Sequence, residues 1–159
     1  MQPPHGDLTR QLSQMQRLIW AGQELAPQSP IYNSAFRIRI PASVNQDVFE
    51  RAFRAIVNRS ETLRTTVAMT DQGIPVAQLA KDPNFEFSVI DLSEKNDPYQ
   101  EACRWCQSRC EQLLPMDSLM FESALLKLND QDYVWFINCL LYTSPSPRDL
   151  STSRMPSSA

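Results

Sequence analysis

Apolar residues recur at helical spacing in three stretches of the chain and alternate with polar residues in several others. The first helix is predicted over residues 8–25, which end before Pro27 and Pro30. Asp7 and Thr9 are the candidate N-caps of this helix. Its apolar stripe is expected to contain Leu8, Leu12, Met15, Ile19 and Trp20.

The next two elements are predicted to be a half-buried strand and an amphipathic helix. Residues 31–40 alternate in polarity, so Arg37 and Arg39 are expected on one face of a strand. The opposite, buried face is expected to carry Phe36, Ile38 and Ile40. Residues 45–59 return to helical spacing, with Asn45 as the predicted N-cap. The buried face of this helix is expected to contain Val48, Phe49, Ala52, Phe53, Ile56 and Val57.

The remainder of the ordered chain predicts a hairpin, a short strand, a helix and two further strands. The hairpin joins residues 63–69 to 74–79 through a turn at 71–73, where Gly73 can adopt positive φ. The other elements are a strand at 85–90, a helix at 98–114 and strands at 119–128 and 133–138, which are predicted to be joined directly at residues 129–132. This order predicts a mixed α/β fold, an α+β two-layer sandwich with helices packed on a sheet. Residues 1–7 are expected to be a flexible N-terminus.

The last part of the sequence differs in composition from the rest. After Tyr142 the chain is rich in serine, proline and threonine and contains few apolar residues. A segment of this kind cannot bury enough apolar surface to offset the entropy lost on ordering. We therefore expect a disordered C-terminal tail.

Composition narrows the class of partner. Hydrophobic residues make up 42% of the chain and charged residues 21%, as in ordinary globular domains. The formal net charge is −3 and no basic stripe is present, which argues against a nucleic-acid partner. No apolar run approaches the length of a membrane span, and residues 1–10 lack the features of a signal peptide. A cytoplasmic protein without a membrane partner is expected.

Four cysteines are present, and three of them fall within one predicted helix: Cys103, Cys106 and Cys110, with Cys139 further along. A Cys-x-x-Cys pair can bind zinc or perform redox chemistry. Here no second pair and no suitably spaced histidine follows, so reduced thiols on a helix face are favoured over a metal site.

No independent catalytic set is apparent in the sequence. A serine or cysteine nucleophile needs a base, and the one histidine, His5, lies in the flexible N-terminus. Glu61, Asp91 and Asp117 have no paired spacing, and the three glycines do not form a phosphate-binding loop.

One motif near the N-terminus resembles the first signature of the condensation domains of nonribosomal peptide synthetases. Ser13, Gln16 and Trp20 match that signature, whereas Met15 and Leu18 depart from it. A plain amphipathic helix is the alternative interpretation of this stretch. We interpret Trp20 as a core residue rather than a substrate contact.

The motif from Arg59 to Thr65 resembles the second signature, Arg-His-Glu-x-Leu-Arg-Thr. Five of the six specified positions match, and Ser60 stands where histidine is usual. It also lies directly after a predicted helix and before a predicted strand, as in the family. This motif is the most specific part of the resemblance.

Two later stretches resemble the segments that precede the family's catalytic motif in the sequence. Residues 114–128 are similar to the family's Phe-Asp-Leu segment and the strand after it. Residues 132–138 are similar to the strand that directly precedes the family's His-His-x-x-x-Asp-Gly motif. Directly after Asn138, however, the sequence continues Cys-Leu-Leu-Tyr-Thr-Ser-Pro, and the chain has no His-His pair. Residues 139–149 resemble one reading frame of a sequencing adapter, so we interpret 139–159 as a non-native or disordered tail. A genuine divergent C-terminus is the alternative.

The resemblance covers residues 8–138 and implies a fold like chloramphenicol acetyltransferase. It implies that the chain is most of the first of two subdomains, an incomplete domain without a catalytic residue of its own. The parent would form amides between acyl or aminoacyl groups held as thioesters on the phosphopantetheine of carrier proteins, with an adenylation domain as a further partner. No cofactor would bind this chain directly. An ester-forming or epimerising relative and a non-catalytic docking fragment remain alternatives.

The resemblance also implies supporting roles near the active site for six residues: Ser13, Gln16, Trp20, Arg59, Glu61 and Arg64. Arg64 corresponds to the arginine expected to pair with the aspartate of the absent motif. Without that aspartate, Arg64 is expected to face solvent or a local carboxylate such as Glu61. The alternative is that Arg64 is a solvated residue at the edge of a strand.

Overall fold

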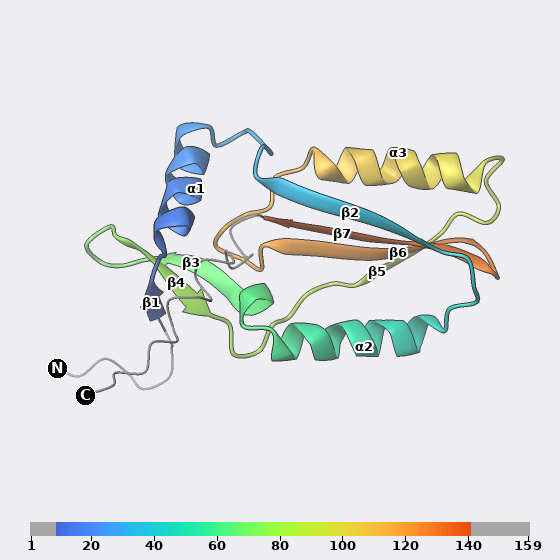
Figure 1. Cartoon of the computed structure of the whole chain (residues 1–159), viewed down its shortest axis with the longest axis horizontal. Helices are drawn as coiled ribbons and strands as arrows, with labels where there is room; N and C mark the ends of the chain where they lie inside the picture. The colour runs from blue at the N-terminus through green and yellow to red at the C-terminus, as the bar shows by residue number, and fades with distance from the viewer. Residues whose placement is uncertain (1–8, 141–159) are drawn as a thin grey trace, which may run out of the picture.

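The computed structural model describes residues 9–140, and Figure 1 shows how their helices and strands are arranged. Residues 1–8 and 141–159 lie outside this description, so the predicted flexible N-terminus and most of the predicted tail lie there too. The elements in chain order are β1 (Thr9–Gln11), α1 (Gln14–Leu25), β2 (Asn33–Ile40), α2 (Gln46–Arg59), the short 3-10 helix η1 (Thr62–Arg64), β3 (Thr65–Met69), β4 (Pro75–Leu79), β5 (Ser88–Asp91), α3 (Pro98–Cys110), β6 (Phe121–Asn129) and β7 (Asp132–Leu140).

A four-stranded sheet in the order β2-β7-β6-β5 forms the centre of the structure. The β2–β7 and β7–β6 pairs are antiparallel, whereas β5 runs parallel to β6 and reaches it through α3. In Figure 1, α3 lies on one side of this sheet and α2 on the other. The predicted mixed α/β fold is confirmed, and because the helices cover both faces, this part of the structure has three layers rather than two.

Both central strands are apolar along nearly their whole length because each has two covered faces. One face of β6 and β7 packs on α3, where Ala102 and Cys106 meet Ala124, Leu126, Leu128, Val134 and Phe136. The other face packs on α2, where Phe53 and Val57 meet Phe121, Leu125 and Tyr133. The predicted connection between these strands is confirmed: the backbone N–H of Gln131 donates to Asn129 Oδ1 over 2.8 Å within the turn.

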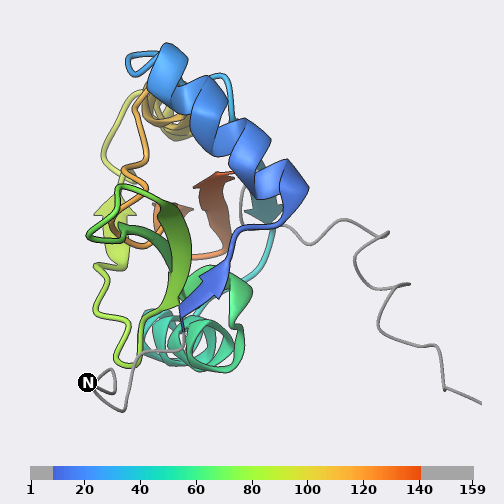
Figure 2. The same cartoon turned by 90° about the vertical axis from the view of Figure 1, so that its left-hand side faces the viewer.

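A second sheet has three strands in the order β1-β4-β3. Its β3–β4 hairpin turns at Gly73, whose φ of 72° confirms the predicted glycine turn. This small sheet and α1 share one cluster of buried residues with the end of the large sheet: Leu12, Ile19, Val67, Ala77, Met120 and Leu140. Figure 2 shows the small sheet and α1 at this end of the molecule.

The prediction of a continuous helix over residues 8–25 is wrong at its start. Thr9–Gln11 form strand β1, which pairs antiparallel with β4, and the helix begins only at Gln14. Ser13 is the N-cap in place of Asp7 or Thr9. Met15, expected in the buried stripe, is 55% exposed. Strand pairing outweighs the local helical pattern here because β4 would otherwise keep an unpaired edge.

The predicted buried faces of β2 and α2 are also too wide. Phe36 is 57% and Ile38 44% exposed, because β2 is an edge strand and α2 packs mainly on its neighbours. On α2, Val48 and Ile56 are exposed, and the helix buries a narrower stripe centred on Phe53. The predicted N-cap is confirmed, since Asn45 Oδ1 accepts a hydrogen bond from the N–H of Val48 at 3.0 Å.

Smaller differences concern where elements begin and end. The strand predicted over residues 63–69 begins at Thr65, after η1, and the helix predicted over 98–114 ends at Cys110. The strand predicted over 85–90 is observed at Ser88–Asp91. Phe85 and Phe87 precede it and join an aromatic cluster beneath α2. Phe85 and Phe87 are therefore apolar because they pack in the core, not because they belong to a strand.

Phe53 is the centre of that aromatic cluster. Its ring centroid lies 5.7 to 6.0 Å from those of four neighbours: Phe85, Phe87, Phe121 and Trp135. Phe53 is only 3% exposed, so truncating it leaves a cavity that the surrounding rings cannot fill.

We predict that Phe53→Ala lowers the free energy of unfolding by about 3–5 kcal/mol, the usual cost of such a cavity. The matched control is Val48→Ala on the same helix, where the side chain is 51% exposed and the change should be within about 0.5 kcal/mol. Urea titrations followed by circular dichroism measure both. Equal losses in the two variants would show that α2 is not anchored through Phe53.

Candidate functional site

Ser13 and Gln16, the first two predicted site residues, form the N-cap of α1. The N–H of Gln16 donates to Ser13 Oγ over 3.2 Å, and the N–H of Ser13 donates to Gln16 Oε1 over 2.9 Å. This reciprocal arrangement is a capping box, which satisfies two backbone donors at the start of the helix. The first motif therefore has a local structural reason for a serine followed three residues later by glutamine.

Trp20 lies on the inner side of α1. It is partly buried and packs with Tyr32 against the cluster that contains Ile19 and Leu140. Tyr32 approaches α1 so closely that a Cβ added to Gly22 would collide with its hydroxyl oxygen. The packing position of Trp20 agrees with its interpretation as a core residue.

Arg59 and Glu61 lie on the surface where α2 ends. Arg59 is exposed in the last turn of the helix, where a positive charge interacts favourably with the helix dipole. The Glu61 carboxylate pairs with Arg10 Nη2 at 2.8 Å, and both side chains are mostly exposed. An exposed pair of this kind contributes little stability, although it does join β1 to the second motif.

Arg64 is held differently from either sequence-based expectation. Its Nη1 donates to the carbonyl of Ala80 over 3.1 Å, and its own carbonyl accepts from the N–H of Ala80 over 2.8 Å. The Nε of Arg64 is buried and has no hydrogen-bond partner in the described structure. The expected pairing with the Glu61 carboxylate is wrong, because that carboxylate binds Arg10 and the Arg64 side chain turns toward β4. Arg64 is also only partly exposed, so it is not a fully solvated edge residue.

Strand β7 continues through the position where the histidine motif was expected. Cys139 pairs with Ser34 and Leu140 with Asn33 in the ladder between β2 and β7. Leu140 is 2% exposed and packs against Val67, which lies three residues after Arg64. The end of β7 therefore lies beside the strand that follows the second motif, and its two last described side chains are a thiol and a hydrocarbon.

Two asparagines that the sequence analysis did not single out connect this strand end to α3. Asn138 is fully buried, and its Nδ2 donates to the carbonyl of Arg109 at 3.5 Å. Asn33 Nδ2 donates to the carbonyls of Cys110 and Gln112 at 3.0 and 2.7 Å. These carbonyls lie in the last turn of α3 and just after it, where the helix leaves acceptors for side-chain donors. A polar residue within an apolar strand run was the available signal for Asn138.

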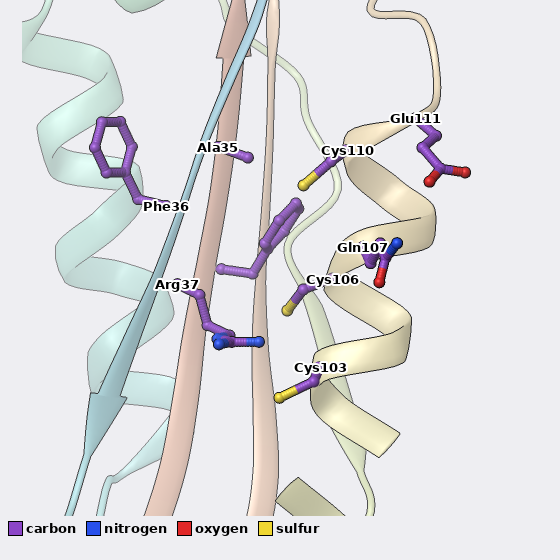
Figure 3. Close-up of a pocket in the computed structure, with 9 residues that line it drawn as sticks. Ala35, Phe36, Arg37, Cys103, Cys106, Gln107, Cys110 and Glu111 are labelled. Carbon is purple, nitrogen blue, oxygen red and sulfur yellow. The ribbon is translucent and has the colours of Figure 1, made fainter. Parts of the chain in front are cut away.

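The three cysteines of α3 face β2 across a shallow pocket, as Figure 3 shows. All four cysteines of the chain are free thiols in the structure. Burial raises the pKa of Cys106 to about 11 and also raises the pKa of Cys110. Within residues 9–140, no group of three or more histidine, cysteine, aspartate or glutamate side chains is placed to hold a metal ion.

Comparison with known proteins identifies the fold and then the family. The structure matches the starter condensation domain of rhizomide synthetase with a TM-score of 0.78 at 30% identity, covering 84% of this chain and 34% of that one. It matches the first condensation domain of the calcium-dependent antibiotic synthetase with a TM-score of 0.77 at 24% identity, which supports the fold alone. Residues 9–139 match the condensation-domain family. The chain belongs to that family.

Two curated relatives are peptide synthases of much greater length. The chain is 31% identical over 136 residues to isonitrile lipopeptide synthase from Streptomyces coeruleorubidus, which covers 82% of this chain and 9% of the relative. It is 31% identical over 137 residues to dimodular nonribosomal peptide synthase from Bacillus subtilis, covering 84% and 6%. The chain thus spans a small part of these relatives and about a third of the solved condensation-domain chains. The described helices include none that is both long and apolar enough for a membrane crossing.

The capping box generates a prediction about the first motif. Ser13→Ala removes the acceptor for the N–H of Gln16 and should lower the free energy of unfolding by about 1 kcal/mol. Ser13→Asp keeps an acceptor at the same place and should retain most of the stability. Thermal or urea unfolding of the two variants measures the difference. If both variants are as stable as the unsubstituted chain, the capping box does not explain the serine at position 13.

Proposed function

We propose that this chain is the first subdomain of a condensation domain that forms amide bonds between carrier-bound thioester intermediates. By this proposal the chain scaffolds the reaction and does not catalyse it alone. The supporting observation is at the end of β7, where Cys139 and Leu140 stand at the positions expected for the catalytic histidines. Neither side chain supplies an imidazole, and Leu140 cannot exchange a proton at all.

The chemistry explains why an imidazole is needed at that place. Amide formation joins the amine nitrogen of one substrate to the thioester carbonyl of the other, and the thiol of the carrier leaves. A base with a pKa near neutrality assists by orienting the amine and accepting its proton. Strand β7 itself contains no histidine, and the chain's one histidine, His5, lies outside the described residues.

Arg64 would serve the complete domain as the partner of a carboxylate. Its Nε is buried without an acceptor, while Nη1 is already bound to Ala80. A buried unpaired donor costs roughly 1–3 kcal/mol, so an arginine in this state is expected to have an acceptor in the finished assembly. An aspartate following the end of β7 is the acceptor that the family resemblance implies.

The substrates would be carried as thioesters on phosphopantetheine, and carrier and adenylation domains would be the partners of the complete protein. Such partners agree with the peptide synthases to which the chain is similar. An ester-forming acyltransferase of the same superfamily would use the same subdomain, with a hydroxyl in place of the amine. A non-catalytic docking role is the remaining alternative.

A direct assay tests whether the chain acts alone. Incubation with an acyl-pantetheine thioester and an aminoacyl-pantetheine thioester should yield no amide above the rate without protein. A complete condensation domain that contains both histidines serves as the positive control under the same conditions. Saturable amide formation by the chain alone, detected by mass spectrometry, would overturn the proposal.

The Arg64 assignment predicts an unusual effect on stability. Arg64→Met removes the unpaired Nε together with the Nη1 hydrogen bond to the Ala80 carbonyl and keeps an apolar stem. The two losses offset one another, so the free energy of unfolding should change by no more than about 1 kcal/mol. Arg39 is the matched control, because it binds the Asp132 carboxylate with Nη2 at 2.6 Å and Nε at 3.0 Å. Arg39→Met should cost more, since Asp132 is largely covered and loses its partner. A loss of more than about 2 kcal/mol in Arg64→Met would identify Arg64 as a structural residue of this chain.

A further inference from the structure

A shallow pocket of about 330 Å³ lies between the edge strand β2 and helix α3. Strand β2 contributes Ala35, Phe36 and Arg37, and β7 contributes Phe136 beneath them. The wall formed by α3 carries three free thiols: Cys103, Cys106 and Cys110. In Figure 3 the three sulfur atoms point toward the strand, and the Arg37 side chain extends toward them. The pocket therefore combines thiols with a cation.

The charge in this pocket differs between its two ends. Arg37 is exposed, and no carboxylate of the described residues is in ion-pair contact with it; its guanidinium lies 5.6 Å from the ring centroid of Tyr99. Tyr99 is one helical turn before Cys103, so Arg37 lies toward the Cys103 end, although its charge also acts on Cys106 and Cys110. The neighbouring Arg39 is already paired with Asp132. At the other end, Glu111 follows Cys110 directly and also lines the pocket.

The three thiols also differ in accessibility. Cys106 is 4% exposed, and burial raises its pKa to about 11. Cys110 is partly buried, and burial together with the nearby Glu111 raises its pKa as well. Cys103 has the same intermediate exposure as Cys110 and lies at the cationic end of the row. An anionic reagent that enters the pocket therefore meets Cys103 under the most favourable conditions.

We propose that Cys103 is a site of reversible thiolation by anionic low-molecular-weight disulfides, which Arg37 holds in the pocket through their carboxylates. The Cys103 thiolate attacks one sulfur of the disulfide, a new S–S bond forms, and the original S–S bond breaks. The second half of the reagent leaves as a thiolate and takes up a proton from water. Cys103 is oxidised and one half of the reagent is reduced, so no further oxidant is required.

The same geometry keeps the mixed disulfide from being resolved within the protein. Residues three or four apart on a helix have Cβ atoms about 5–6 Å apart, whereas a disulfide needs about 3.5–4.5 Å. The attacking form of a cysteine is the thiolate. Because burial raises the pKa of the neighbouring Cys106 to about 11, that side chain is a thiol at neutral pH and does not attack the mixed disulfide. One adduct per chain, without an internal disulfide, is the expected product.

The test is thiolation of the folded chain by glutathione disulfide, followed by intact mass and peptide mapping over time. Cys103 should be modified first, before Cys110 and before Cys139, which packs in the cluster on the α2 face of the sheet. Arg37→Gln should slow modification of Cys103 about two- to fivefold, the size of effect expected for an exposed ionic contact. Arg37→Lys keeps the charge and should restore most of the rate.

Two controls separate charge recognition from simple exposure. The neutral reagent bis(2-hydroxyethyl) disulfide should modify Cys103 equally fast in the parent chain and in Arg37→Gln. Raising the salt concentration to about 1 M should remove the difference seen with glutathione disulfide, because exposed charges are then screened. Circular dichroism confirms that each variant is folded before the rates are compared.

Other outcomes overturn the proposal. Preferential modification of Cys110 or Cys139, or an internal disulfide between Cys103 and Cys106, would show that the pocket does not direct the reagent to Cys103. Equal rates for glutathione disulfide in the parent chain and Arg37→Gln would show that Arg37 does not bind it. None of these results depends on whether the complete domain forms amides.

Discussion

Strands β6 and β7 are covered on both faces, and the remaining elements are arranged around that requirement. Their side chains alternate between a layer shared with α3 and a layer shared with α2. Apolar residues on both faces of a strand must be covered on both, so a helix is needed on each side of the sheet. The chain provides one between β2 and β3 and the other between β5 and β6. The three-layer arrangement follows from these two strands.

Several contacts also hold the end of β7 in place. Burial of Leu140 joins the end of β7 to the small sheet, and Asn33 and Asn138 join the same region to the C-terminus of α3. The second motif enters β3 beside it, with Arg64 bound to Ala80. Many contacts thus hold the backbone around the end of β7. Which chemistry that place can support depends on the residue types at the end of the strand.

The outer strand β2 has a different character from the two central strands. It pairs on one side only, and Phe36 and Ile38, two residues apart on the strand, remain exposed. Exposed apolar residues that lie near one another are typical of a surface that another element covers. On its other side β2 presents Arg37 to the thiols of α3. The two sides of one edge strand therefore offer an apolar surface and a polar, thiol-lined pocket.

The sequence by itself determined the element types, most of their order and the family, because these depend on local periodicity and on short motifs. It predicted the Asn45 cap, the Gly73 turn and the β6–β7 hairpin correctly, since each is encoded within a few residues. Only the tertiary structure decided that Thr9–Gln11 form a strand, because the pairing partner β4 lies more than sixty residues away in the chain. The same holds for Arg64, whose partner is the backbone of Ala80, and for the exposed face of β2, whose burial depends on its place at the sheet edge. Local patterns report what a segment can form, whereas pairing and burial depend on which distant segments lie beside it.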